Sequence, residues 1–186
     1  MKMTREEALE YVRPSLKAHR YEHTVRVTDT AVQLAERFKV DVKKAELAAA
    51  FHDYAKYKPL DVMRRWIVND RRLSKDLLHY HHELWHGPVG ALMLEQEIGL
   101  TDPEILSAIS CHTTGKTHMS LLDKVVFLAD YMEPGRNFPG VEEVRHLAEK
   151  NLDEACALAL KNTIVFLVGK ERTVYPDTFY AYNGLI

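Results

Sequence analysis

Apolar residues recur along this chain with a helical period. Positions three or four residues apart lie on one face of a helix, and residues 20–38 carry such a series. Its members are Val25, Val27, Ala31, Leu34, Ala35 and Phe38. The same period predicts helices over Arg5–Lys17, Arg20–Phe38, Val42–Tyr57, Leu60–Val68, Pro88–Ile98, Pro103–His112, Leu121–Met132, Val141–Asn151 and Leu152–Lys170. Residues 70–83 are too polar for a clear assignment, and no series of period-two strands is evident. The pattern therefore predicts an all-α protein, a compact single-domain helical bundle spanning residues 1–186.

Helix-boundary residues agree with these ranges. Thr4 followed by Glu7 is typical of a capping box, and Ser120 followed by Asp123 suits a second helix start. Gly99 is typical of a helix end because glycine adopts the left-handed conformation easily. Residues 113–116 and 137–140 have the composition of loops.

Ionisable residues interrupt two of the most apolar predicted helices. His52 and Asp53 follow the run Leu47–Phe51, and Asp130 lies within the apolar stretch 121–131. Burying an unpaired carboxylate costs several kcal/mol, and a bound metal ion would remove that cost. The alternative is a hydrogen-bonded histidine–aspartate pair at a helix end.

A metal at this position needs ligands from several helices. Neighbouring side chains on a helix diverge by about 100°, so His52 and Asp53 require partners from elsewhere. His23 and Asp130 lie on suitable helices. Neutral nitrogen and anionic oxygen donors together suit iron, manganese, zinc or cobalt better than calcium.

Composition excludes several classes of function. The chain has 186 residues and a net charge of −2, so it lacks the basic surface expected of a nucleic-acid-binding protein. Cys111 and Cys156 show no disulfide or CxxC spacing, and no apolar run has the length of a membrane helix or a signal peptide. We therefore expect a cytoplasmic protein with a small-molecule partner, without a nucleic-acid or membrane partner.

Several motifs in order resemble one family. They are residues 21–24, 47–57, 86–91, 112–116, 127–134, 138–140 and 176–178. The order of His, His-Asp and Asp on separate helices resembles the HD-domain superfamily of metal-dependent phosphohydrolases, and the additional motifs resemble its YqeK family. The resemblance implies a helical bundle of the HD type, with the metal-site motifs in residues 20–136 and residues 141–186 completing it. It also implies a symmetrical bis(5'-nucleosyl)-tetraphosphatase, which splits diadenosine tetraphosphate into two ADP by attack of a metal-bound hydroxide.

The resemblance assigns roles to individual residues. It implies a metal, most typically iron, held by His23, His52, Asp53 and Asp130, with His52 and Asp53 as catalytic residues. His86 and His112 would bind a second metal ion, or else phosphate or a catalytic water. Substrate contacts are expected from Arg20, His23, Asp53, Lys56, His86, His112, Thr113, Thr114, Lys116 and Arg136. Two positions depart from the family pattern, since Lys116 replaces an expected arginine and Tyr175 replaces a common histidine.

Other interpretations stay open at this point. The chain could be another HD nucleotide phosphohydrolase, such as a nucleoside monophosphatase or a guanosine polyphosphate hydrolase. It could instead be a non-catalytic nucleotide sensor, and a homodimer is one arrangement to be tested. The remaining histidines are expected to face solvent: His19, His79, His81, His82, His118 and His146.

Overall fold

The chain folds into helices joined by short loops. A computed structural model describes residues 3–186, and this range contains ten α-helices and no β-strand. The helices are α1 (Arg5–Val12), α2 (Ala18–Phe38), α3 (Val42–Phe51), α4 (Leu60–Asn69), α5 (His86–Ile98), α6 (Pro103–Cys111), α7 (Leu121–Met132), α8 (Val141–Ala148), α9 (Leu152–Gly169) and α10 (Pro176–Asn183). Three 3₁₀ turns connect them: η1 (Arg13–Ser15), η2 (Lys75–His79) and η3 (His82–Leu84). The prediction of an all-α fold is therefore confirmed.

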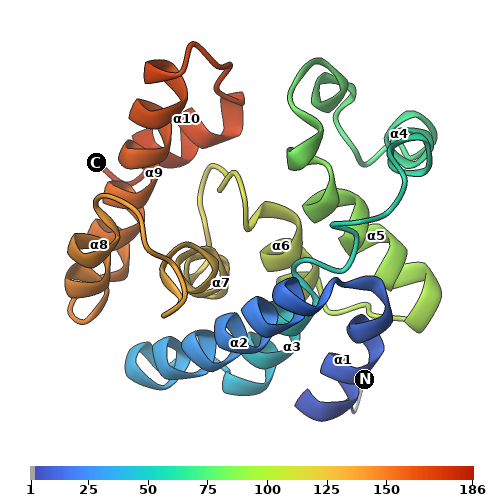
Figure 1. Cartoon of the computed structure of the whole chain (residues 1–186), viewed down its shortest axis with the longest axis horizontal. Helices are drawn as coiled ribbons and strands as arrows, with labels where there is room; N and C mark the ends of the chain where they lie inside the picture. The colour runs from blue at the N-terminus through green and yellow to red at the C-terminus, as the bar shows by residue number, and fades with distance from the viewer. Residues whose placement is uncertain (1–2) are drawn as a thin grey trace.

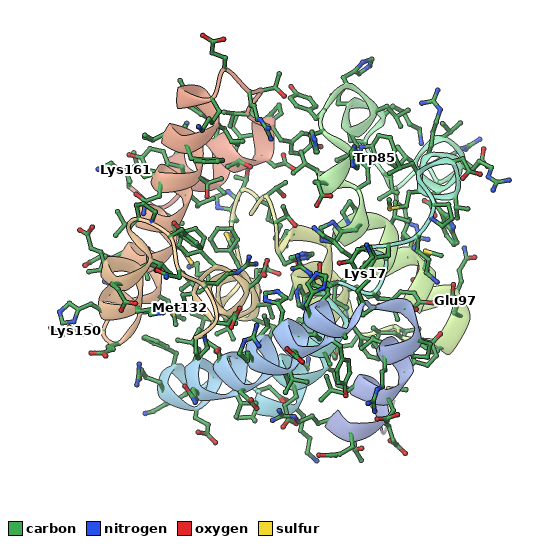
Figure 2. All side chains as sticks on the ribbon, viewed as in Figure 1. Lys17, Trp85, Glu97, Met132, Lys150 and Lys161 are labelled. Atoms are coloured by element: carbon green, nitrogen blue, oxygen red, sulfur yellow. The ribbon has the colours of Figure 1, made fainter. Side chains whose placement is uncertain are left out.

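Helices α2, α3, α6 and α7 form the centre of the molecule. Each of them packs against at least two of the others. Helices α8, α9 and α10 cover the α7 side, whereas α5 packs on α6 on the opposite side and α4 lies against α5 (Figure 1). The buried apolar side chains form one connected core that runs from Ala8 in α1 to Ala181 in α10. Figure 2 shows Glu97, Lys150 and Lys161 at the periphery, where their charges stay hydrated.

Local signals set most helix ends as expected. Thr4 with Glu7 and Ser120 with Asp123 both form complete capping boxes. Gly99 ends α5 in the left-handed conformation, with φ of 67°. Among residues 3–186, no helix combines the length and the apolar character needed to cross a membrane.

Two predicted helix ends are wrong by several residues, and one helix was not predicted. Helix α1 ends at Val12 rather than Lys17 because Pro14 has no backbone N–H to continue the helical ladder. Helix α3 ends at Phe51 rather than Tyr57, since the His52 side chain takes the Ala49 carbonyl and the chain continues as tight turns. Residues 176–183 form a helix of their own, α10, which begins at Pro176 in its favoured first-turn position.

Candidate metal centre

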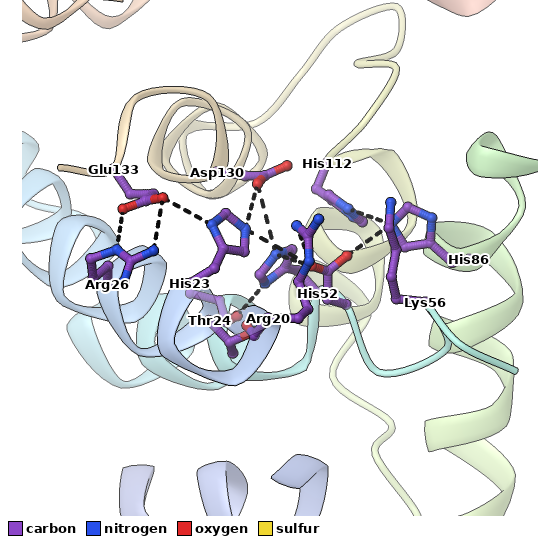
Figure 3. Close-up of polar contacts among 12 residues, drawn as sticks. Arg20, His23, Thr24, Arg26, His52, Lys56, His86, His112, Asp130 and Glu133 are labelled. Carbon is purple, nitrogen blue, oxygen red and sulfur yellow. Dashed lines mark hydrogen bonds and ion pairs between the residues drawn. The ribbon is translucent and has the colours of Figure 1, made fainter. Parts of the chain in front are cut away.

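Buried histidines and carboxylates from the central helices meet at one place. His23 lies on α2, His52 and Asp53 follow α3 directly, and Asp130 lies in the last turn of α7. His86 begins α5 and His112 follows α6. The four histidines and Asp53 are each at most 5% exposed. Figure 3 shows the four histidines and Asp130 converging on one place.

The first cluster joins two imidazoles and two carboxylates. His23 Nε2 lies 3.0 Å from Asp130 Oδ1, and His52 Nε2 lies 3.2 Å from Asp53 Oδ2. The longer separations are 3.8 Å from His23 Nε2 to Asp53 Oδ2 and 3.9 Å from His52 Nε2 to Asp130 Oδ1. These atoms approach closely, yet within the described residues neither Nε2 atom has a hydrogen-bond partner.

The backbone fixes the tautomer of three histidines in the same way. The Nδ1 atom of His52 donates to the Ala49 carbonyl at 2.6 Å. The Nδ1 atom of His86 donates to the Glu83 carbonyl at 2.6 Å, and that of His112 donates to the Ile109 carbonyl at 2.8 Å. A carbonyl oxygen only accepts, so each Nδ1 carries the proton and the neutral ring keeps its lone pair on Nε2. All three lone pairs thus point into the centre.

Glu133 fixes the tautomer of His23 by accepting a hydrogen bond from its Nδ1 atom. Its Oε1 lies 3.0 Å from His23 Nδ1, and its Oε2 accepts from Arg26 Nε at 2.6 Å and from the Gly135 amide at 2.5 Å. The carboxylate is 1% exposed. Sequence reasoning missed this role, although Glu133 follows Asp130 by three residues and such neighbours share a helix face.

The electrostatics of the cluster favour a cation. Burial disfavours charge on Asp53, but His52 and His86 hold the pKa of its carboxyl well below the usual value. Burial acts on Asp130 in the same direction, and His23, His52 and Arg136 are among the groups that lower its pKa. Burial opposes protonation of His52, yet Asp53 and Asp130 raise its pKa overall. Both carboxylates are therefore anionic, and their charge favours a cation at the centre, either a metal ion or a proton on the neighbouring imidazole.

The geometry of this cluster fits a transition metal. Ligand atoms about 2.1 Å from one ion lie about 3.0 Å apart at right angles and about 3.4 Å apart at tetrahedral angles. The separations of 3.0 to 3.9 Å between His23, His52, Asp53 and Asp130 fall near these values. A cation would also give both bare Nε2 atoms a partner. These residues thus fit the metal that the resemblance implies.

His86 and His112 form a second cluster beside the first. Their Nε2 atoms lie 3.0 Å apart, and His86 Nε2 lies 3.1 Å from Asp53 Oδ1. Burial and the neighbouring imidazoles of His86 and His52 lower the pKa of His112 to about 3. With both Nδ1 atoms protonated, two lone pairs face each other unless a cation or a proton lies between them.

The expected substrate residues divide into two groups. Arg20 Nη1 donates to Asp53 Oδ2 at 3.1 Å, and Arg136 Nη2 donates to Asp130 Oδ1 at 2.7 Å, so both guanidinium groups adjoin the centre. Thr113 Oγ1 lies 3.1 Å from His112 Nε2. The other three make contacts elsewhere: Lys56 pairs with Glu83, Lys116 pairs with Asp123, and Thr114 donates to the Gly115 carbonyl.

The remaining histidines lie apart from the centre. All six are exposed to solvent: His19, His79, His81, His82, His118 and His146. Cys111, which neighbours His112 in the sequence, is buried, and burial raises the pKa of its thiol. It remains a thiol and does not join the ligand set.

A helical bundle with a buried histidine–carboxylate centre is typical of the class of metal-dependent hydrolases to which the HD domain belongs. Residues 20–135 match the profile of the HD domain. The chain is 52% identical to a Bacillus subtilis protein called symmetrical bis(5'-nucleosyl)-tetraphosphatase, with 99% of this chain and 98% of the relative covered. A Staphylococcus aureus protein of the same name is 42% identical, with 97% of this chain and 94% of that relative covered. The chain belongs to the HD-domain family and, within it, to the YqeK family of these relatives.

A solved structure has the same fold. It comes from Clostridium acetobutylicum and is described as a predicted HD superfamily hydrolase involved in NAD metabolism. It is 36% identical to this chain, covers 98% of it and 97% of its own length, and superposes with a TM-score of 0.92. The helical arrangement is therefore shared over essentially the whole chain.

Proposed function

We propose that this protein is a symmetrical bis(5'-nucleosyl)-tetraphosphatase that splits diadenosine tetraphosphate into two molecules of ADP. The observation that carries the proposal is the convergence of His23, His52, Asp53 and Asp130, with the histidine lone pairs aimed at the carboxylates. The name of the full-length relatives supports the substrate.

The first metal ion would be held by His23, His52, Asp53 and Asp130. We propose iron as its identity, with manganese, cobalt and zinc as alternatives, because mixed imidazole and carboxylate ligands suit these ions. His86 and His112 would hold a second ion that Asp53 also contacts. The facing Nε2 atoms of these two histidines favour this role over direct contact with phosphate.

The reaction requires a water molecule to attack a phosphorus in the middle of the polyphosphate chain. Bound metal supplies Lewis acidity, which polarises phosphoryl oxygens and lowers the pKa of water. Asp53 stays ionised inside the protein and can accept a hydrogen bond from that water, which orients it. Arg20 and Arg136 lie beside the two carboxylates and can turn their remaining N–H groups to the charged oxygens of the phosphates.

Product analysis tests this proposal. Metal-loaded protein is incubated with diadenosine tetraphosphate, and the products are separated by ion-exchange chromatography. Two equivalents of ADP support symmetrical cleavage, whereas ATP with AMP, or no product, contradicts it. Parallel reactions with nucleoside monophosphates and guanosine polyphosphates test the other HD activities, and unchanged diadenosine tetraphosphate would favour the sensor.

The proposal also concerns the location and the partners of the protein. We propose a cytoplasmic enzyme with a nucleotide substrate and no nucleic-acid partner, in keeping with the net charge of −2. The homodimer stays a prediction that a measurement of native mass would test.

A further inference from the structure

A cavity of about 200 Å³ opens beside the metal centre. Four of its lining residues belong to the centre or adjoin it: His112, Thr113, Asp130 and Arg136. Three others are aromatic: Phe127, Tyr131 and Phe138. The ligand suited to this lining carries an anionic group at one part and a flat apolar ring at another.

Two of the aromatic rings form a corner. The ring centroids of Tyr131 and Phe138 lie 5.0 Å apart, and the ring planes meet at 87°. Both side chains are only partly buried, so their rings have area left to cover. A planar ring that enters the corner can stack flat on one of them and meet the other edge-on, which are two favoured aromatic arrangements.

The walls of this corner are held in place. The Tyr131 hydroxyl accepts a hydrogen bond from Asn162 Nδ2 at 3.4 Å. Asn162 in turn lies against Gly140, where an added Cβ would meet its Nδ2 at 2.8 Å.

The polar residues of the cavity suit phosphate. Arg136 is oriented by two bonds to Asp130, from Nη2 to Oδ1 at 2.7 Å and from Nε to the carbonyl oxygen at 2.9 Å. Its guanidinium has further N–H donors for phosphate oxygens. The cavity is smaller than the roughly 300–1,000 Å³ of a typical small-molecule site, so it suits one part of a large ligand.

We propose that this cavity binds the nucleoside of one half of the substrate. The base stacks in the corner of Tyr131 and Phe138, and the phosphates extend past Arg136 to the metal centre. This assignment rests on the proposed function and adds the position of one of the two nucleosides. It gives the residues 138–140, which the ligand set does not use, a role in substrate binding.

The test uses variants of Phe138 in the metal-loaded, full-length protein. Removing an aromatic stacking partner of a base weakens binding, so Phe138→Ala should raise KM for diadenosine tetraphosphate roughly 5- to 100-fold. The kcat should change by less than about 3-fold because this ring does not touch the reacting atoms. Phe138→Tyr keeps the stacking face and should keep KM near the wild-type value.

The matched control is Phe166→Ala on α9, whose side chain is 59% exposed and does not line the cavity. It should leave KM and kcat unchanged. Metal content and the far-ultraviolet circular dichroism spectrum are recorded for every variant. If Phe138→Ala does not fold, Phe138→Leu replaces it, since leucine keeps apolar volume but has no aromatic face.

The outcomes separate this assignment from the proposed function. The products of the wild-type protein judge the function, whatever the variants do. Wild-type KM in folded Phe138→Ala and Phe138→Leu would overturn the cavity assignment even if two ADP are formed. If the wild-type protein shows no turnover, calorimetric titration with ADP tests the cavity assignment instead. Phe138→Ala should then lower the affinity or the number of bound ADP molecules, and an unchanged isotherm would overturn the assignment.

Discussion

Each histidine of the centre can bind a metal ion through only one ring nitrogen, because the other is already occupied. Backbone carbonyls three residues earlier hold Nδ1 of His52, His86 and His112, whereas a carboxylate holds Nδ1 of His23. An outer partner of this kind fixes the ring and its tautomer and raises the basicity of the free nitrogen. His23 needs a side-chain partner because it lies within α2, where the backbone carbonyls accept the hydrogen bonds of the helix.

The role of Glu133 can be tested by replacing it with glutamine. Glu133→Gln keeps the size of the side chain but loses the charge that pairs with Arg26 and accepts from His23. Loss of such an outer partner typically lowers metal affinity 10- to 100-fold, so we expect about that loss. Metal affinity is measured by competition with a chelator, and bound metal is counted by elemental analysis.

The control for this test is Glu142→Gln on α8. Glu142 is exposed and pairs with Arg145, outside the ligand set. Metal affinity of Glu142→Gln should equal that of the wild type. Equal affinity of the two variants would show that Glu133 does not orient His23.

At the scale of elements, helices α5 and α6 approach unusually closely beside the centre. A Cβ at Gly87 would lie 2.8 Å from the Ser110 carbonyl oxygen and 3.3 Å from His112 Nδ1. Gly87→Ala should therefore force the helices apart and destabilise the protein by about 1–3 kcal/mol. It should also weaken metal binding, because His86 and His112 lie at the ends of these two helices.

A second glycine provides the control. Gly169 ends α9 and has no atom within 4 Å of an added Cβ, so Gly169→Ala should be neutral or stabilising by up to about 1 kcal/mol. Urea unfolding of both variants measures the free energies. Equal stabilities would mean that the contact between α5 and α6 can relax without cost.

Asp123 links α6 to α7 away from the metal centre. Its carboxylate is fully buried and accepts from Ser107 Oγ at 2.6 Å and from the Ser120 amide at 2.8 Å, with Lys116 Nζ at 3.0 Å. Burial opposes ionisation, but these three partners together lower its pKa below the usual value. The side chain therefore contributes stability above the unfolded pKa near 4, and that contribution is lost as pH falls through the lower, folded pKa.

Asp123→Asn should remove this pH-dependent contribution. We expect a loss of about 1–3 kcal/mol at pH 7, because a capping acceptor and a buried ion pair are weakened. The difference from wild type should shrink as the pH falls below about 4 towards the lower, folded pKa, because the carboxyl of the unfolded chain takes up its proton first. Urea unfolding of chelated protein at pH 7 and pH 3 measures both, with the exposed Asp61→Asn as control. A difference that grows toward low pH would contradict this account.

The helices could be predicted from the sequence more reliably than the segments between them. The apolar period and the caps at Thr4 and Ser120 predict α1 and α7 because these signals are local. The end of α3 could not be predicted in that way, since it depends on the His52 side chain competing for the Ala49 carbonyl. The partner of His23 is separated from it by 110 residues, so only the packing of α2 on α7 brings Glu133 into contact.

At the scale of the whole molecule, the metal centre also connects helices that are far apart in the sequence. Its side chains come from α2, α5 and α7 and from the segments after α3 and α6, which meet only in the folded chain. The four candidate ligands were predicted from ionisable residues in apolar sequence together with the family resemblance, and the structure brings all four residues together. The outer partners were not predicted, because each is defined by distance and not by residue type.

A metal that binds only the folded chain must stabilise it by mass action. At a free metal concentration 100 times Kd, one site adds about 2.7 kcal/mol. For a chain of this length, 1 kcal/mol corresponds to roughly 2–4 °C in Tm, so chelation should lower Tm by about 5–11 °C for one site and more for two. Differential scanning calorimetry with and without chelator measures the shift, and re-addition of iron should restore it. Asp53→Ala removes a carboxylate shared by both clusters, so its Tm should not respond to chelator. A wild-type Tm that is equally indifferent to chelator, at a metal occupancy verified by elemental analysis, would show that the four side chains do not bind the ion in the folded state.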